Sequence, residues 1–276
     1  MGIKTIKIQK TDFIEVIGII LLLGIGFFHL TYQLPLVSAT YDEDYSYLGD
    51  GEYLVRYFKW DKQERPYILL HPPLFYYLHG WSSLVFEAKN VDERLYIARL
   101  SMIPLYPFFA ILLYLVSRKW YGRIAALGTL VLYLFNPEIL AHARFITPDH
   151  MLAFMIFATL LGYYAFLHKP HSLIHAVLTG LCLGVALLTK YTSLLLVPLV
   201  FFLGIIFSIG YRQRFRPIFI GTIGVVIIAI LLLHPGYLFR ETGRLPEPFV
   251  SQRMQAMAKV PGVVPLLATV FPRAYL

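Results

Sequence analysis

The chain has 276 residues, of which 58% are hydrophobic and only 14% are charged. Soluble domains carry about one quarter charged residues, so this composition excludes an ordinary soluble protein and indicates an integral membrane protein. The net charge of +8 does not indicate nucleic-acid binding, because the basic residues lie in small groups between apolar runs, as cytoplasmic anchors do. The single cysteine, Cys182, excludes an intrachain disulfide and a cysteine-rich metal site.

Seven apolar segments are long enough to cross a membrane, which takes about 20 mostly apolar residues in a helix. They are 13–34, 97–117, 124–143, 150–167, 172–189, 191–210 and 218–235. Asn136-Pro137 interrupts the third segment, where asparagine can cap a helix and proline can restart it. We therefore expect an all-α integral membrane protein in which residues 1–276 form a single multi-span bundle.

A secretory signal peptide is the alternative interpretation of the first segment. Lys4, Lys7 and Lys10 precede it, and Val37-Ser38-Ala39 resembles a cleavage site. Its apolar core is longer than that of a signal peptide, so we expect a retained spanning helix.

The basic residues of the short loops predict the orientation. With the N-terminus in the cytoplasm, the cytoplasmic segments are 1–12, 118–123, 168–171 and 211–217, which together hold ten Lys and Arg residues and one acid. The opposite face receives residues 37–96, with ten of the sixteen acids. We therefore predict a multi-pass protein of the plasma or inner membrane with 37–96 as its first extracytoplasmic loop.

This loop is too long for a simple connector, and residues 72–88 within it predict a juxtamembrane helix. Pro72 and Pro73 suit a helix start. The aromatic residues that follow suit a helix lying in the headgroup zone. An eighth span is the alternative, but the segment is short, and a span here would invert the charge pattern downstream.

Three acids, Asp42, Glu43 and Asp44, follow the first span. Crowded carboxylates repel one another, which raises the pKa of at least one of them and makes it a better general base. A solvated acidic loop is the other interpretation.

Asp149 is a further acid at a membrane boundary, a position that suggests function. Structural capping explains it equally well: Thr147 can cap the next helix, Pro148 suits its first position, and an acid in the first turn complements the helix dipole.

Arg144, Lys190 and His71 share the extracytoplasmic face in this scheme. Arginine binds phosphate in a bidentate manner, and lysine acts as a point charge. Structural alternatives remain for each: Arg144 can reach towards headgroups, Lys190 can complement a helix C-terminus, and His71 can cap the interfacial helix. With the acids, they would suit a lipid-linked phosphate leaving group beside a base.

Four stretches in order, YDEDYSYLGDGEYL, HPPLFYYL, NPEILAHARFITPDHMLAF and LGVALLTKYTSLLLVPL, resemble the polyprenyl-phosphate-dependent glycosyltransferases of the GT-C class. That class includes the dolichyl-phosphate-mannose protein mannosyltransferases and the aminoarabinose transferase of lipid A. The resemblance runs from about Phe13 to Tyr237. It implies a GT-C-like bundle that transfers a sugar from a polyprenyl-phosphate donor to a protein, lipid or glycan acceptor.

The resemblance also implies roles for individual residues. Asp42 and Glu43 match the acidic pair that opens the first loop, with Asp42 as the base, and Asp44 is the alternative base because YDED offers two registers. Asp149 matches the second acid of the family. The mechanism implied is a direct inverting displacement, with the departing phosphate stabilised by Arg144, Lys190 and His71.

A divalent cation, Mg²⁺ or Mn²⁺, is a candidate cofactor, since some relatives use a metal and others do not. The acids could supply its oxygen ligands: Asp42, Glu43 and Asp149, and also Asp44.

The chain departs from the family in having about seven spans, where relatives have eleven or more. It ends within the apolar stretch 260–276, so we expect it to be incomplete at the C-terminus. A noncatalytic membrane subunit is therefore one alternative function. A transporter or flippase of a lipid-linked sugar is another. Such proteins carry ionisable residues or broken helices near the bilayer midplane, whereas the fourth to seventh predicted spans here have none at their centres.

Overall fold

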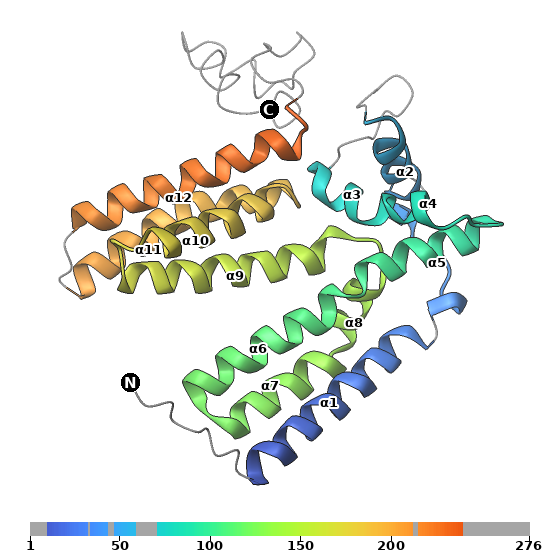
Figure 1. Ribbon diagram of the computed structural model, residues 1–276, viewed down its shortest axis with the longest axis horizontal. Helices are drawn as coiled ribbons and strands as arrows, with labels where there is room; N and C mark the ends of the chain where they lie inside the picture. The colour runs from blue at the N-terminus through green and yellow to red at the C-terminus, as the bar shows by residue number, and fades with distance from the viewer. Residues whose placement is uncertain (1–9, 33, 44–46, 59–70, 212–214, 240–276) are drawn as a thin grey trace, which may run out of the picture. The chain divides into compact units, whose positions relative to one another are not determined.

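A computed structural model describes residues 10–32, 34–43, 47–58, 71–211 and 215–239 (Figure 1). Helices are the only regular elements within these ranges, so the predicted all-α class is confirmed. The chain divides into two compact units, residues 1–49 with 79–150 and residues 50–78 with 151–276. The single domain predicted for 1–276 stays a prediction, and each unit is described by itself.

The first unit is built from a long N-terminal helix and the helices of residues 82–144. They are α1 (Lys10–Thr31), α4 (Ser82–Val85), α5 (Val91–Met102), α6 (Leu105–Tyr121), α7 (Arg123–Phe135) and α8 (Pro137–Arg144), with the 3₁₀ turn η1 (Leu34–Leu36). Helices α1, α6 and α7 pack side by side (Figure 1). Tyr106, Ala110, Leu130 and Leu134 are among the residues buried in their core.

The break between α7 and α8 falls where the sequence predicts it. The Asn136 side chain accepts hydrogen bonds from the backbone N–H groups of Glu138 (2.9 Å) and Ile139 (3.1 Å), and Pro137 occupies the first turn of α8. The two helices are bent by 58°. The asparagine thus satisfies backbone donors that a helix start leaves unpaired.

An ion cluster joins α1 to α6 and α7 near the N-terminal end of α1. Oε1 of the buried Glu15 carboxylate accepts hydrogen bonds from the Tyr114 hydroxyl and from Arg118 Nε (3.1 Å). Oε2 lies 3.4 Å from Arg123 Nε. Pairing of this kind is what a carboxylate needs when it is withdrawn from water.

The second unit contains most of α2 (Leu48–Tyr57), α3 (Pro73–Gly80) and α9 (Pro148–His168). It also contains α10 (Leu173–Leu187), the 3₁₀ helix η3 (Tyr191–Leu195), α11 (Leu196–Gly210) and α12 (Phe215–Gly236). Helix α10 packs along α12 through Gly180 and Gly184, four residues apart. A Cβ at Gly180 would lie 2.7 Å from Ile228 Cβ and 2.8 Å from the Val225 carbonyl. Small residues at this spacing let two membrane helices approach closely.

Helices lie on all seven predicted spans. In the described part of the chain, five helical segments are long and apolar enough to cross a membrane, and α7 with α8 makes a sixth if the bent pair is one span. Helix α10 has only 15 residues. Residues 72–88, for which a juxtamembrane helix is predicted, contain the two helices α3 and α4, separated at Trp81. Their location beside the membrane stays a prediction. Residues 260–276 lie outside the described residues.

We expect Gly180→Ala to destabilise the helix pair. The added methyl group meets the α12 backbone, which cannot move aside as a flexible side chain would, and overpacking of this kind costs about 1–3 kcal/mol. Gly224→Ala on α12 is the control, because nothing lies within 4 Å of its Cβ position. Thermal unfolding of the purified full chain in detergent measures both. Equal midpoints for the two variants would contradict the close packing.

Candidate active site

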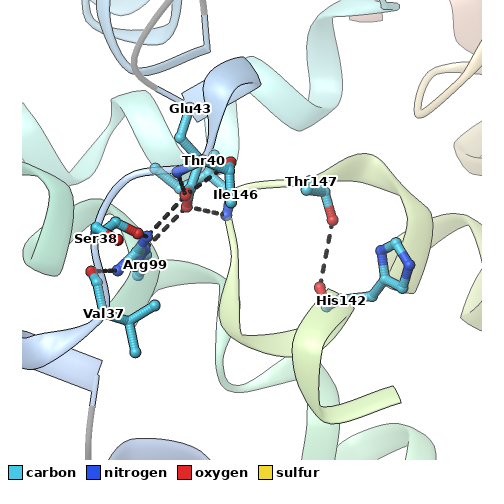
Figure 2. Close-up of polar contacts among 8 residues, drawn as sticks. All are labelled: Val37, Ser38, Thr40, Glu43, Arg99, His142, Ile146 and Thr147. Carbon is cyan, nitrogen blue, oxygen red and sulfur yellow. Dashed lines mark hydrogen bonds and ion pairs between the residues drawn. The ribbon is translucent and has the colours of Figure 1, made fainter. Parts of the chain in front are cut away.

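Glu43 is the centre of a second group of polar contacts in the first unit, separate from the Glu15 cluster (Figure 2). Its side chain is fully buried. Oε1 accepts hydrogen bonds from Arg99 Nε (2.9 Å) and from the backbone N–H of Ile146 (2.8 Å). Oε2 accepts from Arg99 Nη2 (2.7 Å) and from the backbone N–H and the hydroxyl of Thr40, both at 3.0 Å. Both carboxylate oxygens are therefore fully engaged by the protein.

Arg99 on α5 is the partner that the sequence analysis did not single out. Its side chain is 1% exposed and donates through Nη1 to the Val37 carbonyl (2.7 Å) and through Nη2 to the Ser38 carbonyl (2.9 Å). The guanidinium also lies 5.2 Å from the centre of the Phe145 ring. Its position inside the predicted second span was the available signal, since an ionisable residue at membrane depth is normally paired and functional.

The Glu43–Arg99 pair joins three segments that are distant in the sequence. They are the chain leaving the first span (37–43), helix α5, and the link 145–147 between α8 and α9 (Figure 2). Asp42 directly precedes Glu43, and Asp149 lies three residues after Ile146, in the first turn of α9. The pair therefore fixes the backbone beside both candidate catalytic acids.

The pKa of Glu43 shifts in the direction opposite to the one expected for a crowded carboxylate. Burial raises it, but hydrogen bonds from Arg99, Ile146 and Thr40 outweigh burial, and the net pKa is lowered from its ordinary value of 4.5. Burial lowers the pKa of nearby His79 to about 3, against the attraction of the Glu43 charge. His79 is thus neutral at physiological pH, and Arg99 supplies the positive charge that Glu43 needs.

The charges of Asp42 and Asp149 both raise the pKa of one buried tyrosine, Tyr47. Burial raises the pKa of Tyr47 to about 12, and the charges of Asp42 and Asp149 contribute to that increase. Tyr47 is 7% exposed, whereas Asp42 is exposed and Asp149 is partly buried. The charges of the two aspartates therefore both influence one hydroxyl that stays protonated at neutral pH, which the sequence could not show.

Arg144 contacts the end of α1. Its Nε donates to the Leu30 carbonyl (3.1 Å) and its Nη2 to the His29 carbonyl (3.1 Å). Basic side chains commonly satisfy the last carbonyls of a helix in this way. The Thr147 hydroxyl donates to the His142 carbonyl at 3.4 Å (Figure 2), a long contact that links the end of α8 to the start of α9.

Lys190 and His71 belong to the second unit. Lys190 precedes η3, and its carbonyl accepts from the Ser193 hydroxyl (2.6 Å). His71 lies just before α3 and contacts the edge of Phe75. The backbone N–H of Leu74 donates to the Leu188 carbonyl (3.2 Å). This hydrogen bond joins the segment that carries His71 to the segment that carries Lys190.

The divalent cation stays a prediction, and three of its candidate ligands lie in the described part of the chain. Within the described ranges no three His, Cys, Asp or Glu side chains converge closely enough to hold a metal ion, and Asp42, Glu43 and Asp149 are included in that statement. The physical reason at Glu43 is that Arg99, Ile146 and Thr40 occupy its oxygens. Asp44, the alternative base, lies outside the described residues.

Together, the apolar helices long enough to cross a membrane indicate a multi-pass membrane protein, and its described part carries a buried group of polar and charged residues around Glu43. The chain belongs to the dolichyl-phosphate-mannose-protein mannosyltransferase family, whose model matches residues 67–243, more than half of the 276 residues. The class is that of membrane glycosyltransferases that use a lipid-linked sugar, as the sequence resemblance predicted. The match contains Arg99, Arg144 and Asp149 and begins after Asp42. A comparison with curated proteins found no match.

We expect Glu43→Gln to lower stability far more than Asp42→Asn. Removing one partner of a buried ion pair leaves an uncompensated charge and costs about 3–5 kcal/mol, whereas Asp42 is exposed. Thermal unfolding of the full chain compares the two. Because the folded-state pKa of Glu43 lies below 4.5, its contribution is fully present above that pH and is lost as the pH falls through the folded-state value. Equal stability of the wild-type chain and Glu43→Gln at neutral pH would contradict the stabilising role of the Glu43–Arg99 pair.

Proposed function

We propose that this chain transfers a sugar from a polyprenyl-phosphate donor to an acceptor hydroxyl on the extracytoplasmic face, with inversion and with Asp42 as the base. The observation that carries the proposal is the difference between two adjacent acids: Glu43 is buried and ion-paired, while Asp42 is exposed. A base must reach substrate, and only an exposed carboxylate beside a rigid backbone meets that requirement.

The proposed step is a single displacement. The acceptor hydroxyl gives its proton to Asp42, its oxygen forms a bond to the anomeric carbon, and the bond from that carbon to the phosphate oxygen breaks. The polyprenyl phosphate leaves with the electron pair. The protein contributes by positioning the reactants and by stabilising the developing charge.

Glu43 is a positioning residue in this proposal. Its buried bonds to Arg99 and to the Ile146 backbone hold the segments that carry Asp42 and Asp149. Asp149 is proposed to orient the acceptor, supported by its effect on the same Tyr47 hydroxyl as Asp42. We assign the leaving phosphate to Arg144, Lys190 and His71. The proposed step uses only groups of this chain.

The family description supports a polyprenyl-phosphate-mannose donor and a protein acceptor, and these are the substrates we propose first. The same chemistry would serve a lipid or glycan hydroxyl. Family membership also favours transfer over the transport of a lipid-linked sugar, because the family is one of mannosyltransferases.

We expect Asp42→Asn to reduce sugar transfer by at least about 100-fold, the usual contribution of a general base, without loss of folded protein. Asp149→Asn is expected to reduce transfer more than it reduces stability. The assay follows label from polyprenyl-phosphate-mannose into a protein acceptor, using the full chain in membranes. Asp92→Asn is the matched control, since Asp92 is an exposed acid in the same predicted loop. Full activity in Asp42→Asn would remove Asp42 from the mechanism.

The orientation has its own test in a Cys182→Ala background. We expect Ser38→Cys to react with a membrane-impermeant maleimide applied to intact cells. Tyr121→Cys, at the far end of α6, should react only after the membrane is opened. Both positions are exposed. The reverse pattern would place the N-terminus outside and overturn the proposed location of the site.

A further inference from the structure

A second polar feature lies in the other unit, remote in sequence from the candidate catalytic acids. A pocket of about 650 Å³ is formed where α9 has ended and α12 begins, and it is lined by Pro170, His171, Phe215, Arg216, Pro217 and Ile220, with Gly221. Its volume falls within the range of ligand-binding pockets, about 300–1,000 Å³.

The pocket carries positive charge and no negative charge among its lining residues. Arg216 and His171 are both exposed. In the sequence, the stretches 168–171 and 211–217 that include these two residues also contain Lys169, Arg212 and Arg214 and no acid. An anion is therefore the ligand that this composition favours.

Arg216 is also poorly placed for helix stability. It lies in the first turn of α12, which contains no acidic residue, and a cation there opposes the helix dipole. A bound anion would interact favourably with both Arg216 and the unpaired backbone N–H groups of that turn.

The remaining lining is apolar and lies at the ends of candidate spans. The span of α9 ends at His168, and that of α12 begins at Phe215. Gly221 brings α12 close to Phe166, since a Cβ there would lie 2.4 Å from the ring. A pocket that combines a cation with mostly apolar residues at the ends of candidate spans suits a phosphate anchored in lipid better than a soluble one.

We propose that this pocket binds the phosphate headgroup of an anionic phospholipid, with Arg216 as the principal contact and His171 as the second. The acyl chains would lie along the apolar residues of α12. The proposal does not depend on the transferase function, and it concerns a lipid other than the sugar donor.

The test is native mass spectrometry of the purified full chain in detergent with phosphatidylglycerol or phosphatidylcholine. We expect preferential retention of phosphatidylglycerol, and we expect Arg216→Gln to weaken it by about fivefold, which corresponds to about 1 kcal/mol for one basic group near an anionic lipid. Lys119→Gln is the matched control, because Lys119 is an exposed cation at the end of another span. Thermal unfolding confirms that each variant is folded.

Three outcomes would overturn the proposal. Equal retention of the two lipids would exclude a headgroup preference. Equal losses in Arg216→Gln and Lys119→Gln would show general attraction to basic loops. Stabilisation by inorganic phosphate equal to that by phosphatidylglycerol would assign the pocket to a soluble anion. If Arg216→Gln does not fold, His171→Gln takes its place in this comparison, because His171 lines the same pocket.

Discussion

A single buried ion pair, between Glu43 and Arg99, holds together the part of the chain that carries the candidate catalytic acids. Withdrawing two charges from water is costly, and attraction between them offsets that cost only with good geometry and further hydrogen bonds. Here Glu43 accepts from two backbone N–H groups and a hydroxyl as well as from Arg99, and Arg99 donates to two carbonyls. The pair is consequently sensitive to the position of every segment that it touches, and it specifies one arrangement of them.

The pair also explains how adjacent carboxylates come to differ. Asp42 and Glu43 follow one another in the sequence, yet one is exposed and the other is fully buried. Glutamate has the longer side chain and reaches the guanidinium, and its pKa is lowered by the bonds it accepts. A carboxylate so stabilised in its charged form is a weak base. The environment therefore separates two chemically similar groups into one that holds the backbone through buried hydrogen bonds and one whose side chain is exposed.

The sequence predicted what depends on local pattern and missed what depends on distant partners. Apolar length located the helices on all seven predicted spans, and Asn136-Pro137 located the break between α7 and α8, because capping involves neighbouring residues. The Glu43–Arg99 pair joins residues 56 apart, and no local signal specifies which cation a buried acid will meet. The same limit applies to Arg144, whose contact with the end of α1 spans 114 residues. It applies also to Tyr47, whose pKa is raised by the charges of both Asp42 and Asp149.

Polar contacts at helix ends have a particular importance in a membrane protein, because lipid provides no hydrophobic drive to bring spans together. Helix α1 is tied at both ends: Glu15 contacts Arg118 and Arg123 near its start, and Arg144 binds the carbonyls of its last turn. These contacts fix α1 along its axis relative to α6, α7 and α8. Beyond the 3₁₀ turn η1, residues 37–40 lead into a helical turn that begins at Tyr41 and contains Asp42. Glu43 follows and is fixed in turn by Arg99. The position of Asp42 is thus set from both sides, by the helix that precedes it and by the ion pair that follows it.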